Sequence, residues 1–133
     1  MATQIPIIYG TTITAQASAA ITAGTVSTGA LTTIDNAKTG NGGGCHLYKC
    51  IARVTVAPSG AAVCRLYYSG AESGTPTNFD SGSLSASIPS GGTGDFPLGD
   101  IILPDNFSRV KIGAEDYGFS ASLIVVPILP EAQ

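Results

Sequence analysis

The clearest pattern in the chain is an alternation of apolar and polar residues in its middle third. From Tyr48 to Val56 the even positions are Tyr, Cys, Ala, Val and Val, and most odd positions are polar. A period of two predicts a strand with one buried face. Turn residues occupy 57–60, and the even positions of 62–68 repeat the alternation. The pattern predicts two strands paired in a hairpin about Ser59, with the even positions forming one apolar side.

This hairpin has consequences for individual side chains. It places Tyr48 and Tyr68 in the core of the protein, because both lie on the apolar side. It also sets Arg53 opposite Arg65, and like charges directly opposite each other are mildly unfavourable. We therefore expect the hairpin itself, with a register that can slip.

The pattern of the remaining residues predicts short strands separated by loops. Further strands are predicted at 84–88, 107–112 and 120–128, a short buried run at 101–103, and loops or turns at 41–44, 70–79, 90–94 and 115–118. Strands of this length at such spacing, about seven or eight in total, are typical of an antiparallel β-sandwich or barrel. No segment has the pattern of a helix of ordinary length.

The first 40 residues differ in character from the rest of the chain. They are rich in Thr, Ala and Ser, and no charged side chain precedes Asp35. The β-branched runs at 5–9 and 11–14 favour extended structure. Residues 15–21 could form a short helix, although the flanking Thr and Gly residues disfavour one. We interpret 1–40 as an extended N-terminal arm with the first strands, and 41–133 as the β-sandwich of one domain.

Composition agrees with a folded chain whose surface is partly covered. The 133 residues fit one domain, and 44% are apolar, which argues against disorder. Only 11% are charged, against about 25% in an ordinary soluble domain. Because solvated surfaces usually carry more charge, we expect part of this surface to contact other proteins.

The charge distribution disfavours several classes of partner. The net charge is −3, and the six basic residues are scattered, whereas nucleic-acid binding needs clustered Lys and Arg. We also find neither the basic start and apolar run of a secretory signal nor an apolar run long enough to span a bilayer. The sequence predicts no nucleic-acid partner and no membrane partner.

The cysteines and the single histidine are the first candidates for chemistry. Cys45, His46, Cys50 and Cys64 could be combined as zinc ligands, but they lack the two close pairs typical of structural zinc. Cys45 and His46 are a poor catalytic pair, because adjacent strand residues point to opposite faces. We expect Cys50 and Cys64 to be small core residues, and a disulfide from Cys45 to Cys50 or between subunits stays open. No metal and no cofactor is predicted.

The carboxylates give no catalytic pair either. Most of the nine acidic residues are expected in loops, where they usually act as solvated turn-formers: Asp80, Asp95, Asp100, Asp105, Glu115 and Asp116. Glycosidase chemistry needs two carboxylates flanking one bond, and nothing in the sequence brings two of these together. We predict that the protein is not an enzyme and has no catalytic residues.

The order of features in the second half resembles a known family. The features are the strand pair 48–69, Gly-Thr-Pro-Thr at 74–77, Ile-Pro at 88–89, Ile-Leu-Pro at 102–104, Ser-Arg-Val-Lys-Ile at 108–112, and a final strand around 119–125. Over roughly 45–128 the chain is similar to the small jelly-roll cement, or decoration, proteins that cover the heads of some tailed bacteriophages. These motifs are structural and are shared with other phage head and tail proteins.

The resemblance implies a function and a location. A protein of this family is a non-enzymatic virion component, made in the cytoplasm of the host bacterium, that binds the outside of the capsid. It clamps neighbouring major capsid proteins and often forms a homo-oligomer, such as a dimer or trimer. We expect the contact surface at residues 1–34 and the loop tips.

Other functions remain open from the sequence. One alternative is another virion component, a tail-tube or head–tail joining protein. Another is a carbohydrate-binding β-sandwich, which would need exposed aromatic rings in a chain with no Trp and only five Tyr. A small enzyme is disfavoured for lack of an acid–base pair. A soluble β domain with no assigned role is a further alternative, because a role in assembly leaves no catalytic fingerprint in a sequence.

Overall fold

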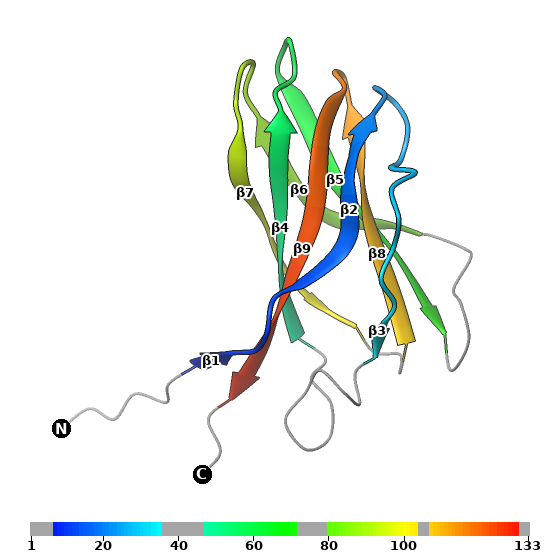
Figure 1. The fold of residues 1–133 in the computed structure, drawn as a ribbon, viewed down its shortest axis with the longest axis vertical. Helices are drawn as coiled ribbons and strands as arrows, with labels where there is room; N and C mark the ends of the chain where they lie inside the picture. Colours follow the sequence, from blue (N-terminus) through cyan, green and yellow to red (C-terminus); the bar gives the residue numbers. More distant parts are fainter. Residues whose placement is uncertain (1–6, 36–46, 72–79, 104–106, 131–133) are drawn as a thin grey trace, which may run out of the picture.

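The structure, a computed structural model, describes residues 7–35, 47–71, 80–103 and 107–130. These residues form nine strands in two antiparallel sheets that stack face to face (Figure 1). They contain no helix, and so none that is long and apolar enough to cross a membrane. The prediction of an all-β antiparallel sandwich is confirmed.

Each sheet has a simple strand order. The first sheet contains β1 (Ile7–Tyr9), β2 (Ile13–Ile21), β9 (Phe119–Pro130), β4 (Leu47–Val56) and β7 (Gly94–Ile102). In it β9 pairs with β1 and β2 on one side and with β4 on the other, and β7 lies beyond β4. The second sheet contains, in order, β3 (Ile34–Asp35), β8 (Phe107–Glu115), β5 (Ala62–Ala71) and β6 (Asp80–Ile88).

The strand pairs are nested along the chain. β5 pairs with β6, β4 with β7, β3 with β8 and β2 with β9, all antiparallel. From β2 onward the chain changes sheet at each connection between these strands, except between β5 and β6. The result is one long double ribbon folded across itself, so that successive strand pairs along the ribbon lie alternately in the two facing sheets.

The core lies between the sheets and uses alternate residues of each strand. The fully buried large side chains come from both sheets and include Tyr48, Leu66, Ile88, Ile112, Leu123 and Val125. Burying apolar area is the main favourable term in folding, about 25 cal/mol for each Å². The period of two in the sequence therefore reports on which face of each strand meets this core.

The predicted hairpin of 48–56 with 62–68 is wrong. β4 lies between β9 and β7, and β5 lies between β8 and β6, so the two strands belong to opposite sheets. The connection crosses from one sheet to the other and buries Pro58. The physical reason is that both strands carry an apolar face, and these faces cover each other better across a core than side by side in one sheet.

The alternation itself is confirmed, with limits at its ends. Tyr48 is fully buried, whereas Tyr68 is half-buried and packs against the core. Val56, expected on the apolar side, is 59% exposed at the end of β4. Arg53 and Arg65 do not face each other, because their strands are in different sheets.

Most other predicted elements are confirmed. The strands expected at 84–88, 107–112 and 120–128 lie within β6, β8 and β9, and residues 90–93 form the turn between β6 and β7. The buried run at 101–103 is wrong in part, because Ile102 is 67% exposed at the end of β7. The predicted loop at 41–44 and most of the one at 70–79 lie outside the described residues.

The N-terminal segment is largely built into the sandwich. Residues 15–21 are strand and not helix, as part of β2. β1 and β2 pair with β9, and β3 pairs with β8, so these first strands belong to the same sandwich as the rest. The remaining parts of the predicted arm region, residues 1–6 and 36–40, lie outside the described residues.

One buried polar side chain joins the two sheets at this side of the molecule. Gln16 is fully buried in β2, where two register shifts interrupt the pairing with β9. Its Nε2 donates to the carbonyl oxygen of Ala121 in β9 at 3.1 Å and to that of Ala17 at 2.8 Å. Its Oε1 accepts from the backbone N–H of Ile112 in β8 at 3.2 Å. The side chain therefore satisfies backbone groups of both sheets inside the core.

Residues 22–33, which we call the closing segment, complete the same corner. The segment runs back along β2, where Ala17 N donates to Ala30 O and Thr32 N donates to Ala15 O. It also bonds to β8, where Gly24 N donates to Ala114 O and Ser27 N donates to Ile112 O, both at 2.8 Å. The open edge between the two sheets is therefore covered by the chain's own backbone.

Replacing Gln16 with alanine should destabilise the fold by about 2 to 4 kcal/mol, because buried backbone groups of Ile112 and Ala121 lose their partner. Urea unfolding followed by circular dichroism measures this change. Thr14→Ala, an exposed position on the same strand, is the control and should stay within about 0.5 kcal/mol of the wild type. Equal stability of the two variants would contradict the bridging role of Gln16.

Candidate interaction surface

The two described cysteines are core residues and not reactive groups. Cys50 in β4 and Cys64 in β5 are fully buried free thiols on opposite sheets. Burial raises the pKa of Cys64 to about 12, and burial with the nearby charge of Asp100 raises the pKa of Cys50 to about 12. Since the thiolate is the nucleophile and the metal ligand, both side chains act as small hydrophobes, as the sequence predicted.

The metal and catalytic sets considered from the sequence lie partly outside the described residues. Cys45 and His46 are outside the described part of the chain, so the structure tests neither the zinc site nor the Cys45–Cys50 disulfide. Within the described ranges no three His, Cys, Asp or Glu side chains come together in a way that could hold a metal ion.

The acidic residues sit on strands more often than expected. Asp80, Asp95, Asp100 and Glu115 belong to β6, β7 and β8, which corrects their placement in loops. Asp116 does lie in the turn after β8, and Asp105 lies outside the described residues.

Two of these carboxylates pair with arginines on the outside of the sandwich. Arg53 Nε donates to Asp95 at 2.9 Å, and Arg65 Nε donates to Glu115 at 3.2 Å. The hydrogen bond from Arg53 lowers the pKa of Asp95 below its ordinary value. Each acid faces a base and not a second acid, so neither pair supplies the two carboxylates that glycosidase chemistry requires.

The loops at one end of the sandwich form a continuous surface, which we call the tip surface. It consists of the ends of strands and the connections at 22–24, 56–61, 89–93 and 116–118, which lie together at the top of Figure 1. The four connections consist mainly of Gly, Ser, Thr, Ala and Pro, with Asp116 as their only charged residue, and Glu115 at the adjoining end of β8 is paired with Arg65. This end of the molecule is therefore nearly neutral.

Contacts between the loops hold the tip surface together. Gly91 N donates to Pro58 O at 3.0 Å, which joins the β6–β7 turn to the β4–β5 connection. A Cβ added at Gly60 would collide with the ring of Tyr117, so the Tyr117 ring rests on the Gly60 backbone. A Cβ at Gly118 would lie 2.6 Å from the carbonyl oxygen of Ile21, so the β8–β9 turn sits equally close to the end of β2. The four loops thus support one another.

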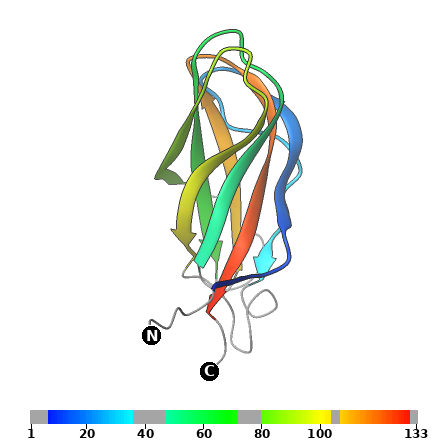
Figure 2. The same ribbon diagram turned by 90° about the vertical axis from the view of Figure 1, so that its left-hand side faces the viewer.

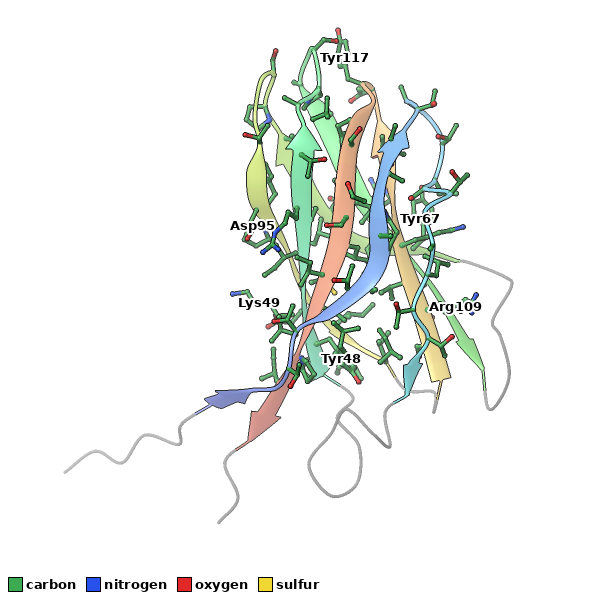
Figure 3. All side chains as sticks on the ribbon, viewed as in Figure 1. Tyr48, Lys49, Tyr67, Asp95, Arg109 and Tyr117 are labelled. Atoms are coloured by element: carbon green, nitrogen blue, oxygen red, sulfur yellow. The ribbon has the colours of Figure 1, made fainter. Side chains whose placement is uncertain are left out.

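Two large apolar side chains project from this supported surface. Tyr117 is 45% exposed and lies at the outermost point of the tip in Figure 3, and Val56 is 59% exposed. A tyrosine fixed on one side and free on the other offers contact area at little cost in conformational entropy, and Ser and Gly around it adapt to a partner's hydrogen bonds. The arrangement suits contact with another macromolecule.

Sequence reasoning located this surface only in outline. It expected contacts at the loop tips and a turn at 115–118, but it did not single out Tyr117. The available signal was an aromatic residue inside a turn, between Asp116 and Gly118, where a large ring has no strand face to bury it. Its support by Gly60, which lies far away in sequence, could not be seen without the fold.

Comparison of the chain with protein-family models, with curated proteins and with solved structures finds no match.

In the folded protein we expect iodoacetamide to leave Cys50 and Cys64 largely unmodified near pH 8, while unfolding in guanidinium exposes both. A pKa of about 12 leaves roughly a thousandfold less thiolate than a pKa of 9.0 at this pH, and burial blocks access as well. Peptide mapping by mass spectrometry measures the modification. Equal labelling of Cys64 in the folded and unfolded states would contradict its assignment to the core.

The same shifts predict a pH dependence of stability. Because each thiol has a higher pKa folded, about 12, than unfolded, 9.0, the native state keeps protons that the unfolded chain loses. The contribution to stability is complete below pH 9 and is lost as the pH rises toward 12. Urea unfolding at increasing pH should show a smaller loss for Cys64→Ala than for the wild type, and identical slopes would contradict this cause.

Proposed function

We propose that this chain is a jelly-roll cement, or decoration, protein of a bacteriophage virion. In this proposal it is made in the bacterial cytoplasm, binds the outer surface of the head and clamps neighbouring major capsid proteins without enzymatic activity. The observation that carries the proposal is the tip surface, a neutral and mutually supported set of loops from which Tyr117 and Val56 project.

The strand connectivity supports the jelly-roll part of the proposal. A jelly roll has eight main strands in two facing sheets and is common in viral capsid domains. Leaving out the short β1, the sheets here have the orders β2-β9-β4-β7 and β3-β8-β5-β6, and the nested pairs form one folded double ribbon. The same architecture also hosts lectins, so the connectivity supports the fold and not by itself the function.

The chemistry of the tip surface supports attachment to a protein. Docking this end would require the desolvation of a single charged residue of the tip loops, Asp116. Burying unpaired charge is costly, so a neutral surface is suited to a tight contact on a capsid. The supported ring of Tyr117 is the type of anchor that dominates binding energy at protein interfaces, and the exposed side chain of Val56 adds apolar contact area beside it.

The tip surface also bears on the carbohydrate-binding alternative. Sugar recognition by a β-sandwich relies on exposed aromatic rings, and Tyr117 is the only aromatic side chain among the strongly exposed large hydrophobic residues of the described chain. Its one open face could stack on a sugar ring, but the neighbouring loops add mainly small residues. A protein partner uses the whole surface, which is why we favour it.

A binding assay with phage heads that lack the protein tests the proposal. We expect the purified chain to co-sediment with heads and to saturate at a fixed number of copies that matches the symmetry of the shell. Failure to co-sediment would contradict the proposal. Binding of oligosaccharides that is lost with Tyr117→Ala would instead favour the carbohydrate-binding alternative.

Within this assay Tyr117→Ala should weaken binding by about 10- to 100-fold, the effect typical of a central aromatic anchor. Tyr67→Ala is the matched control, because Tyr67 lies on the outer face of the second sheet, away from the tip (Figure 3), and should leave occupancy unchanged. If both variants bound heads as tightly as the wild type, the contact surface would lie elsewhere on the protein.

A further inference from the structure

The outward face of the β4–β7 pair, which we call the β4–β7 face, has an ordered composition. Core residues of β4 such as Tyr48, Cys50 and Ala52 point inward, so the odd positions between them point away from the core. Their partners on β7 share this outward face. Leu98, the extra residue of a register shift opposite Cys50 and Ile51, is itself buried.

Two cross-strand pairs on this face are apolar. Leu47 pairs with Ile102, and Ile51 pairs with Pro97. Ile102 is 67% exposed and Pro97 is exposed, while Leu47 and Ile51 are partly exposed. Large apolar side chains grouped in this way on the outside of a sheet commonly mark an interaction site.

Two further pairs, alternating with the apolar ones, are charged. Lys49 pairs with Asp100, and Arg53 pairs with Asp95. Both bases are on β4 and both acids are on β7, so the face has a basic row beside an acidic row. Lys49 and Asp95 project on this side of the molecule in Figure 3, and Figure 2 views it from the β7 side.

This pattern is complementary to itself. A two-fold axis parallel to the strands and between β4 and β7 would place β4 of one copy against β7 of a second copy. Residues at the same height along the strands then face each other, so each cross-strand pair meets its own counterpart. Lys49 would face the second copy's Asp100, Arg53 its Asp95, and Ile51 its Pro97. The alternative axis, perpendicular to the strands, would set base against base.

We propose that the β4–β7 face is a homodimer interface, occupied by a second copy of this chain related by that two-fold axis. In a two-fold interface the same patch serves both subunits, so it must contain both partners of every contact, and this face does. Complementary charges fix the register of such a contact, and the apolar pairs supply the buried area. The resemblance to cement proteins already implies a homo-oligomer, and the inference goes beyond it by assigning the face and the axis, which are argued from this chain's own residues and not from attachment to a phage head.

Edge-to-edge association is a poorer use of β7. As the last strand of its sheet, β7 contains Pro97, which lacks an N–H, and two acidic residues, Asp95 and Asp100. Proline and charge are the usual means by which an edge strand is kept from pairing with another chain. Among its described residues the outward face of the second sheet has no such matched rows, because Arg65 on β5 is paired with Glu115 on β8 whereas Lys111, also on β8, lies opposite Tyr67.

Charge reversal tests the proposal without disturbing the core. One variant carries Asp95→Lys and Asp100→Lys, and the other carries Lys49→Asp and Arg53→Asp. In each variant both rows of the face have the same sign, so we expect the dimer dissociation constant to rise about 100-fold or more. Sedimentation equilibrium of the full chain over a range of concentrations measures it.

Mixing the two variants gives the decisive result. The acidic face of one should match the basic face of the other, so a heterodimer should form although neither variant dimerises by itself. The control variant carries Arg65→Asp and Lys111→Asp on the second sheet. Its net charge changes by the same amount as that of Lys49→Asp with Arg53→Asp, and it should dimerise like the wild type. A monomeric wild type, variants that dimerise normally, or a mixture that stays monomeric would each overturn the proposal.

These outcomes are separate from those of the head-binding assay, because sedimentation of the purified protein involves no capsid. A chain that dimerises but does not bind heads would contradict the cement role and support the dimer interface. A chain that binds heads as a monomer would support the cement role and contradict the dimer interface.

Discussion

The structure depends on closing the corner where β2 meets β8. A sandwich made from one folded ribbon ends in open edges, and backbone groups there must find partners inside the protein. Gln16 supplies them from within the core, with one amide group bonded to Ala121 of the first sheet and Ile112 of the second. The closing segment covers the same corner from outside. These contacts make β2 and the closing segment part of the fold.

With that corner closed, the remaining surface divides into regions of different chemistry. The tip surface is neutral, and its loops fix one tyrosine in an exposed position. The β4–β7 face alternates apolar and charged pairs. The tip lies at the end of the strands and the face lies along them, so a protein could be held at its tip and still present its flank to a copy of itself.

The interior offers nothing to catalysis within the described residues. Its two thiols are kept protonated by burial, and the two ion pairs at the surface join an acid to a base. Low overall charge and small residues in the loops suit the proposed packing against other surfaces. The low charge is visible in the composition, and the structure gathers the small residues in the loops of the tip surface.

The amino-acid sequence by itself determined the β class, most strand positions and the buried faces, including Tyr48, Cys50 and Cys64, because an alternation of period two is local and survives any arrangement of strands. It did not determine which strands pair. β4 and β5 are consecutive in sequence and were expected to form a hairpin, yet they face each other across the core. Four features join residues that are distant in sequence. They are the pairing of the strands, the support of Tyr117 by Gly60, the hydrogen bonds of Gln16 to both sheets, and the matched rows of the β4–β7 face. Only the tertiary structure decides them, since apolar faces can be covered in several ways and the whole chain selects the one that leaves the fewest edges and buried polar groups unsatisfied.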